Sequence, residues 1–194
     1  MSYEVLARKY RPINFQEVVG QDHIIKALTN SIEQEKIHQA YIFAGTRGVG
    51  KTTIARILAK CLNCESESKP ISTPCNKCSN TIEIREGRSV DFLEIDAASN
   101  TQVEKIRDLI ETVEYKPAKA RFKVYLIDEV HMLSTASFNA LLKTLEEPPA
   151  HVIFIFATTN PEKIPKTVQS RCLQLNLKTV DEESLIKHFK EILK

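Results

Sequence analysis

The residues best suited to chemistry in this sequence lie at positions 45–53. They match the pattern Gly-x-x-x-x-Gly-Lys-Thr at every fixed position, and glycines let a backbone curl until its N–H groups face a shared anion. Lys51 can reach the β- and γ-phosphates of a nucleotide, and the Thr52 hydroxyl can ligate Mg²⁺. The predicted nucleotide-binding residues are Gly45, Thr46, Arg47, Gly48, Val49, Gly50, Lys51, Thr52 and Thr53.

Two elements must position this phosphate loop. Residues 41–44 form a short apolar run bounded by glycine, which predicts a buried strand. After Thr52, apolar residues recur at helical spacing as far as Leu62, so the phosphates would lie at a helix N-terminus. We expect Lys51 to face solvent until phosphate arrives, so that its loss would affect binding more than folding.

An acidic pair follows a second apolar run, residues 124–127. Ligands bind at the carboxyl ends of strands in open α/β folds, where Asp128 and Glu129 are expected to lie. Asp128 would support the Mg²⁺ ion together with Thr52, and Glu129 would polarise the attacking water as a general base. The alternative is a solvated acidic pair without chemistry.

Strands and helices alternate along the rest of the chain. Further strands are predicted at 91–95, 152–157 and 173–177, and helices at 21–34 and 101–114. Another helix is predicted to be capped by Ser134, and a last one to open with a capping box formed by Thr179 and Glu182. This alternation predicts an α/β fold with a parallel sheet covered by helices on both faces.

Length and composition limit the possible classes of protein. The 194 residues suit one domain with the start of a second, and the net charge of +2 says little about nucleic acid. No apolar run approaches the roughly 20 residues of a membrane span, and the N-terminus is too polar for a secretory signal. A cytoplasmic protein without a membrane partner is the expectation. Its five cysteines would be metal ligands or reduced thiols.

Several segments resemble one family. Residues 45–52, 126–133 and 170–172 are similar to AAA+ clamp loaders, which are P-loop NTPases. Residues 7–12, 94–99 and 142–149 resemble more closely the gamma/tau subunits of bacterial DNA polymerase III. The resemblance extends over nearly the whole chain, from residue 3 to about residue 178. It implies a AAA+ nucleotide-binding domain at residues 1–178 with a five-stranded parallel sheet, and the first helix of a truncated lid at 179–194.

The resemblance also implies a function. The chain would bind and hydrolyse ATP as a subunit of the DNA polymerase III clamp loader, and so help to load the sliding clamp onto primed DNA. Its partners would be the delta and delta prime subunits, further gamma/tau copies, the clamp and DNA. Two alternatives are a structural subunit that does not hydrolyse ATP and another AAA+ motor, such as a branch-migration helicase.

Site residues follow from the family by position. Tyr10, Arg11 and Pro12 would pack around the adenine. Thr159 falls at the sensor that contacts the γ-phosphate or its water. Arg171 would be an arginine finger that acts on ATP bound in the neighbouring subunit. The alternative for Arg171 is a surface arginine before a strand.

The cysteine module, residues 61–88, offers two Cys-x-x-Cys pairs, Cys61 with Cys64 and Cys75 with Cys78. Four thiolates suit a structural zinc site. The family carries such a module here, but its last ligand would fall near Thr81, which cannot serve. Cys61, one turn before Cys64, would then supply the missing thiolate. The alternative is a buried Cys61 and a loop without metal.

Contacts with DNA are the least visible feature. In clamp loaders, helix N-termini hold the backbone of primed DNA. Asn100, Thr101 and Gln102 open a predicted helix and could offer N–H groups to phosphate. Lys105 and Arg107 could add positive charge, or they could belong to a solvated helix face.

Overall fold

The structure is a computed structural model, and it describes residues 10–99 and 103–192. Asn100, Thr101 and Gln102, which we predict to contact phosphate, lie outside the described residues, and so does the Lys105 side chain. Residues 7–9 of the family motif also lie outside them. The DNA contacts therefore stay predictions.

The centre of the fold is a five-stranded sheet in which every strand pair is parallel. The spatial order is β2-β3-β4-β1-β5. The strands are β1 (Ala40–Ala44), β2 (Phe92–Asp96), β3 (Lys123–Asp128), β4 (Val152–Thr158) and β5 (Leu173–Asn176). All five coincide with the predicted apolar runs to within two residues. The predicted α/β fold with a five-stranded parallel sheet is confirmed.

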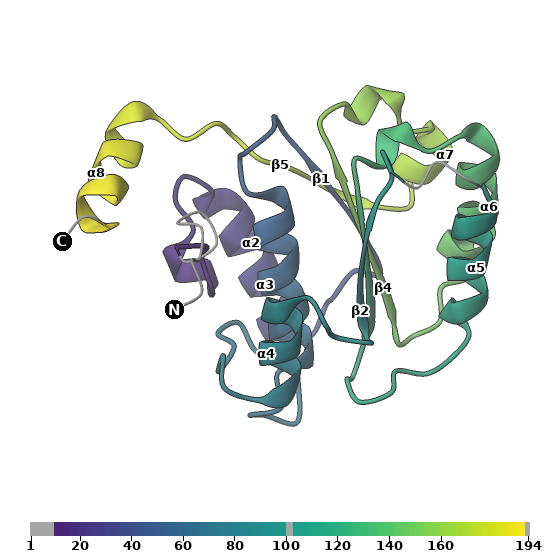
Figure 1. The fold of residues 1–194 in the computed structure, drawn as a ribbon, viewed down its shortest axis with the longest axis horizontal. Helices are drawn as coiled ribbons and strands as arrows, with labels where there is room; N and C mark the ends of the chain where they lie inside the picture. The colour runs from purple at the N-terminus through teal and green to yellow at the C-terminus, as the bar shows by residue number, and fades with distance from the viewer. Residues whose placement is uncertain (1–9, 100–102, 193–194) are drawn as a thin grey trace.

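Helices cover both faces of this sheet (Figure 1). One face carries α2 (Asp22–Glu33), α3 (Lys51–Asn63) and α4 (Ser79–Glu86). The other carries α5 (Val103–Val113), α6 (Thr135–Glu146) and α7 (Lys166–Gln169). Three short 3₁₀ turns also occur: η1 (Phe15–Glu17), η2 (Val130–Met132) and η3 (Pro161–Lys163). In the part of the chain that the structure describes, no helix combines the length and apolar character that a membrane crossing requires.

The core lies in two layers because strand side chains alternate between the two faces. In β1, Tyr41 and Phe43 pack with α2 and α3, while Ile42 packs on the opposite layer. In β4, Ile155 joins the first layer and Phe156 the second. Both layers exclude water, which explains why these strands read as continuous apolar runs.

The α4 helix was not predicted. Residues 65–88 contain two prolines and little apolar sequence, so they read as irregular. The helix buries Asn80 and Thr81 beside Ile84, and hydrogen bonds to backbone carbonyls satisfy both polar side chains. Because its buried face is mostly polar, hydrophobic periodicity could not reveal it.

The last helix, α8 (Glu182–Ile192), begins where we expected, but the predicted capping box is wrong. The Asp181 carboxylate, rather than Thr179, accepts a hydrogen bond from the Ser184 amide at 2.9 Å. A second bond, from the Ser184 hydroxyl at 2.8 Å, holds the same carboxylate. An ionised carboxylate at the N-cap also favours the helix dipole, and these bonds lower the pKa of Asp181.

The segment between β5 and α8 is held against the body of the protein by the buried Leu177, whose amide donates to the Ala44 carbonyl at 2.7 Å, and by Lys178. The buried Gln21 amide donates to the Lys178 carbonyl at 2.6 Å and accepts from the Lys178 amide at 3.0 Å. Beyond this point α8 lies apart from the sheet (Figure 1) and exposes Leu185, Ile186 and Phe189. Gln21 is also the residue that precedes α2.

Candidate functional site

The phosphate loop joins β1 to α3 and depends on its glycines. Gly48 and Gly50 have φ angles of +85° and +99°, which glycine adopts without strain. A side chain at Gly45 would place its Cβ 2.9 Å from the Leu177 carbonyl oxygen. Gly50 precedes α3 and carries no side-chain cap, and the first turn of α3 contains no acid. The first N–H groups of α3 are therefore available to an anion.

Lys51 does not face solvent, so that expectation is wrong. The residue is 6% exposed, and its Nζ donates to the carbonyls of Gly45 at 2.8 Å and Thr46 at 2.9 Å. Burial lowers the pKa of Lys51, while the Glu129 and Asp128 carboxylates oppose this shift. An ammonium group has three N–H donors, so the loop holds the lysine in place and leaves a third donor for phosphate.

The predicted Mg²⁺ ligands come together although they are 76 residues apart. The Thr52 hydroxyl donates to Asp128 Oδ2 at 2.8 Å. Thr52 lies in the first turn of α3, and Asp128 ends β3. The other oxygen of Asp128 accepts the Glu129 amide at 2.9 Å. A hydroxyl and a carboxylate at this separation offer two oxygen ligands of the kind that Mg²⁺ prefers.

Glu129 has a strained backbone, with a φ angle of +47°. A non-glycine residue in this region costs roughly 1–2 kcal/mol, and such strain is concentrated at functional sites. Its Oε2 atom accepts a hydrogen bond from Thr159 Oγ1 at 3.2 Å. His131 Nδ1 lies 3.4 Å from the same oxygen and 3.0 Å from Thr158 Oγ1. The predicted general base and the predicted sensor are therefore in direct contact.

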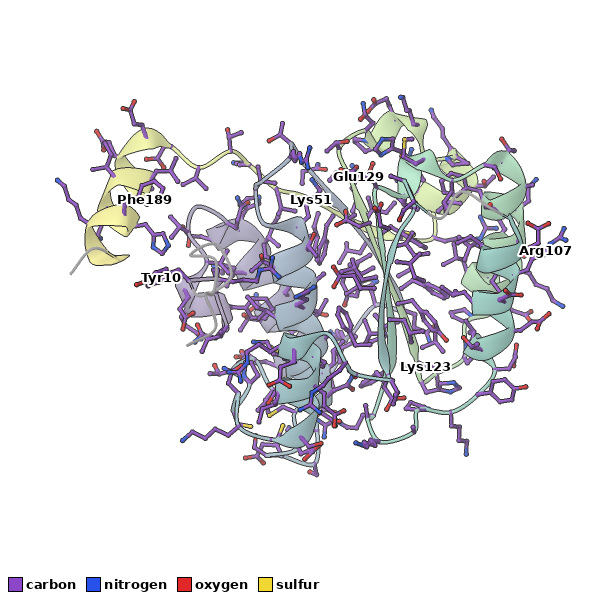
Figure 2. The ribbon with its side chains drawn as sticks, viewed as in Figure 1. Tyr10, Lys51, Arg107, Lys123, Glu129 and Phe189 are labelled. Atoms are coloured by element: carbon purple, nitrogen blue, oxygen red, sulfur yellow. The ribbon has the colours of Figure 1, made fainter. Side chains whose placement is uncertain are left out.

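The phosphate loop and the acids at the strand ends line an open cavity of about 530 Å³. Figure 2 shows Lys51 and Glu129 near the same end of the sheet, while Lys123 lies at the other end. The cavity is lined by Arg11, Arg47, Gly48, Gly50, Lys51, Thr52, Thr53, Asp96, Ala98, Asp128 and Glu129. Three bases and three acids thus face one space, a charge balance that suits a phosphate with a bound cation.

The structure also places several residues that the sequence-based predictions omitted or assigned to another role. Asp96, which was not predicted as a site residue, lines the cavity and pairs in register with Asp128 across β2 and β3. Because Asp96 ends its strand, as Asp128 does, the sequence could have indicated this position. Arg11 lines the cavity, whereas Tyr10 and Pro12 are not part of its lining. His131 is largely buried, and its contact with Glu129 was not predicted.

Arg171 is held away from this cavity. Its Nη2 atom is 2.7 Å from Glu146 Oε1, and its Nη1 atom donates to the Thr167 carbonyl at 2.5 Å. The side chain is 33% exposed and does not belong to the cavity lining. Cys172, the next residue, packs partly buried against the layer that contains α5 and α6, and burial raises the pKa of its thiol to about 12.

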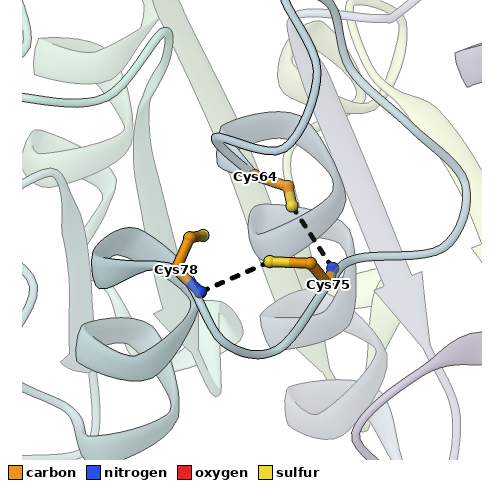
Figure 3. Close-up of side chains that lie close together, drawn as sticks. All are labelled: Cys64, Cys75 and Cys78. Carbon is orange, nitrogen blue, oxygen red and sulfur yellow. Dashed lines mark hydrogen bonds between the residues drawn. The ribbon is translucent and has the colours of Figure 1, made fainter.

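The cysteine module brings three thiols together (Figure 3). The sulfurs of Cys64, Cys75 and Cys78 all lie within 4.8 Å of one another. Cys64 follows the end of α3, and Cys78 precedes α4. The Cys75 amide donates to Cys64 Sγ at 3.3 Å, and the Cys78 amide donates to Cys75 Sγ at 3.3 Å. Three soft donors in this arrangement fit three of the four positions of tetrahedral zinc.

Cys61 does not complete the group, so the prediction that it supplies the fourth thiolate is wrong. Its sulfur is fully buried and faces the Ser72 carbonyl at 3.5 Å. Burial raises the pKa of this thiol strongly, which disfavours the thiolate that a metal requires. Among the described histidine, cysteine and carboxylate side chains, only Cys64, Cys75 and Cys78 form such a group.

Comparisons with known proteins agree with this geometry. The family described as "DNA polymerase III, delta subunit" matches residues 20–181. The chain is 61% identical to DNA polymerase III subunit tau of Escherichia coli (strain K12) over 193 residues, which cover 100% of this chain and 30% of that protein. It is 57% identical to subunit gamma of Buchnera aphidicola subsp. Schizaphis graminum, covering 100% and 53%. The chain thus spans about a third to a half of these relatives.

Solved structures share the fold at low sequence identity. The Thermotoga maritima RuvB Holliday junction branch migration motor has a TM-score of 0.66 and 20% identity, covering 93% of this chain and 53% of that chain. A DNA polymerase III gamma subunit-related protein of Thermotoga maritima has a TM-score of 0.53 and 18% identity, covering 88% and 49%. The predicted AAA+ fold is confirmed by these similarities and by the sheet order. The chain belongs to the DNA polymerase III delta-subunit family, and along its whole length it is similar to the tau and gamma subunits of DNA polymerase III.

Proposed function

We propose that this chain binds and hydrolyses ATP as a subunit of a DNA polymerase III clamp loader, and that it helps to place a sliding clamp on primed DNA. The single observation that carries the ATPase part of this proposal is the 2.8 Å hydrogen bond between Thr52 and Asp128, which both line the cavity. It joins the two oxygen groups that a Mg²⁺–nucleotide needs, beside the N-terminus of α3.

Nucleotide binding would use the backbone of residues 45–53 together with Lys51. The lysine is already held by the Gly45 and Thr46 carbonyls, so little side-chain entropy is lost when phosphate binds. A bound Mg²⁺ ion would neutralise phosphate charge between Thr52 and Asp128. Arg11 lines the cavity and would face the nucleotide, with Tyr10 and Pro12 beside it on the same segment.

Hydrolysis would depend on Glu129. Its carboxylate accepts a bond from Thr159 and lies beside the largely buried His131, so its orientation is set by two side chains. A carboxylate held in this way can take a proton from an attacking water as a general base. Thr159 would contact the γ-phosphate or that water, and it would give up its bond to Glu129 to do so.

Arg171 would complete the site of a neighbouring subunit. It lies outside the cavity of its own chain, and its pairing with Glu146 leaves it at the surface. An arginine supplied in trans stabilises the charge of the phosphoryl-transfer transition state. The proposed neighbours are the delta and delta prime subunits and further gamma/tau copies, with the clamp and primed DNA as the macromolecules acted upon.

Three further points belong to this proposal. Residues 1–178 would form the nucleotide-binding unit, and α8 would begin a helical lid. The cysteine module would bind zinc. The protein would work in the cytoplasm, where bacterial DNA is replicated, as part of a DNA-directed DNA polymerase holoenzyme with nucleotidyltransferase activity. A subunit that does not hydrolyse ATP has less support, because Lys51, Thr52, Asp128 and Glu129 all line one cavity.

The decisive experiment measures ATP turnover in a reconstituted loader, with and without clamp and primed DNA. Replacing Glu129 by Gln in the chain should retain ATP affinity and abolish the turnover that depends on this subunit. A matched control is Glu162→Gln, since Glu162 is an exposed carboxylate on η3 outside the cavity lining. Normal turnover with Glu129→Gln would favour the structural-subunit alternative.

A further inference from the structure

We propose that Cys64, Cys75 and Cys78 form a three-thiolate zinc site whose fourth position, beside Thr81, is occupied by an exchangeable oxygen ligand from solvent. This inference deepens the proposed zinc binding and rests on it. It assigns to Thr81 a role that a closed structural site would give to a fourth cysteine.

The three sulfurs are arranged before any metal binds. With a Zn–S distance of about 2.3 Å, a tetrahedral site would need sulfurs about 3.8 Å apart, and the three lie within 4.8 Å of one another. Cys75 Sγ accepts amides from both Lys77, at 3.5 Å, and Cys78, at 3.3 Å. Asn76, whose φ angle is +54°, makes the turn that aims both amides at this sulfur. Donors of this kind stabilise a thiolate.

The position of Cys78 also favours negative charge. This residue is the N-cap of α4, an eight-residue helix, so its sulfur lies near the positive end of the helix dipole. A cation lies close to the module as well, since the Arg121 guanidinium donates to the carbonyls of Cys64 and Leu62 at 2.5 and 3.0 Å. Three thiolates with Zn²⁺ carry one net negative charge, which these groups offset.

The fourth position is next to Thr81. Its Oγ1 atom is 3.2 Å from Cys78 Sγ, and the side chain is only 1% exposed. The hydroxyl can donate to the Cys78 carbonyl at 3.0 Å, and the oxygen then keeps two lone pairs that can accept a hydrogen bond. A neutral hydroxyl is a weak zinc ligand, but those lone pairs can accept a hydrogen bond from a water bound to the metal.

No further cysteine, histidine or carboxylate of the described residues supplies this ligand. Cys61 is turned toward Ser72, and no histidine or carboxylate of the described residues joins the three-sulfur group. Cys75 and Cys78 are half-buried, so solvent can approach the cluster from their side. An open position of this kind is the feature that separates reactive zinc sites from closed structural ones.

The test uses Co²⁺ and Zn²⁺ with the purified chain, kept reduced. Thr81→Cys should raise the thiolate-to-cobalt charge-transfer absorption by about one third, since four thiolates replace three, and it should slow zinc release to a chelator at least about tenfold. Thr81→Val should keep the absorption of the original protein and release zinc faster. Cys61→Ser should change neither measurement, and Cys75→Ser should lose the metal.

A second measurement probes the fourth position directly with an added ligand. A small thiol, such as 2-mercaptoethanol, should add charge-transfer absorption to the cobalt form of the original chain but not to Thr81→Cys, in which the position is filled. Equal absorption in the original chain and Thr81→Cys, or no response to the thiol, would overturn the inference. So would a loss of absorption in Cys61→Ser, or metal uptake by Thr81→Cys alone.

Nucleotide affinity, measured on the same samples, separates this inference from the ATPase proposal. We expect it to be equal in all four variants, because the module lies at the far end of α3 from the phosphate loop. A chain that takes up cobalt as described but binds no nucleotide would refute the ATPase proposal alone. A chain that binds nucleotide but no metal would refute the zinc site alone.

Discussion

The phosphate loop and the cysteine module lie at opposite ends of the same helix, α3, and they are held by different kinds of contact. The loop is fixed mainly by backbone geometry, through Gly48 and Gly50 and the start of the helix. The module is fixed by side chains: Arg121 donates to the Cys64 carbonyl, and Lys60 donates to the Asn76 side-chain oxygen. The backbone geometry of the loop requires glycines at fixed positions, so it can be recognised in a sequence. The side-chain contacts of the module depend on the identity of each residue, so one substitution can change the chemistry of the module.

Arg171 gives the prediction with the largest expected effect, because the proposed function has this arginine act on ATP bound in a neighbouring subunit. In an assembled loader with clamp and primed DNA, Arg171→Ala should lower turnover roughly 10³- to 10⁵-fold. The isolated chain should hydrolyse ATP slowly with or without the substitution, at unchanged ATP affinity. Arg88→Ala, which removes a surface arginine paired with Glu86, is the control. An isolated chain as fast as the assembly would show that the site is already complete.

Lys51→Ala should show that the loop also contains a buried side chain. Nucleotide affinity should fall at least about 100-fold, since the loss of a charge-assisted hydrogen bond costs roughly 3 kcal/mol. Stability should fall too, by roughly 1–2 kcal/mol, because the Gly45 and Thr46 carbonyls lose their donor. Titration calorimetry and urea unfolding measure the two effects.

The control for Lys51 is Lys123→Met. Lys123 is another buried lysine, at the opposite end of the sheet, and it donates to the Thr112 carbonyl. This variant should lose stability but keep its nucleotide affinity. Equal affinity in Lys51→Ala and the original chain would remove the lysine from the binding site.

The loop and its strands were predictable because a parallel sheet buried on both faces leaves continuous apolar runs. The same logic placed Asp128 and Glu129 at a strand end. The exposure of Lys51 was predicted wrongly. Its two hydrogen bonds go to backbone carbonyls of its own loop, and the sequence pattern does not indicate such bonds. The contact between Glu129 and His131 was not predictable either, since it depends on a strained turn.

The cysteine module was only partly predictable for the same physical reason. Spacing identified Cys64, Cys75 and Cys78, but it also suggested Cys61, whose sulfur turns toward Ser72. Thr81 was dismissed as a ligand by its chemistry, and only the fold places its oxygen beside Cys78. Where a segment is held by polar side chains, spacing gives candidates and the structure decides among them.

Arg121→Leu would test whether the module is independent of the loop. The guanidinium donates to three carbonyls, those of Leu62, Cys64 and Glu67. Its loss should lower the free energy of unfolding by roughly 2–3 kcal/mol, since buried carbonyls lose charged donors. Urea unfolding measures this, and nucleotide titration should give the same affinity as the original chain. A parallel fall in affinity would mean that the two ends of α3 are coupled.

Lys60 gives the last prediction, which concerns pH. Burial lowers the pKa of Lys60 to about 8, while the unfolded chain keeps an ordinary lysine. Between pH 8 and about 10.4 the unfolded state therefore binds more protons, so stability should rise with pH by up to about 1.4 kcal/mol per unit. Below pH 8 this contribution should be constant.

The comparison protein for this measurement is Lys60→Met. Other titrating groups act in both proteins, so the difference between their unfolding free energies isolates Lys60. That difference should rise from pH 8 to pH 10 in favour of the original chain. A flat difference would mean that the lysine keeps its charge while it bonds to Asn76 and the Ile13 carbonyl.

Gln21 has a mechanical consequence. Its amide grips Lys178 by two bonds, while its own backbone begins the turn into α2. A force that moves α8 would therefore reach the body of the protein through residues 177–178, and part of it would pass through Gln21 into α2. Residues of α2 and α3 pack in the same core layer, and α3 begins at the phosphate loop. A displacement of α8 could therefore be transmitted to the phosphate loop.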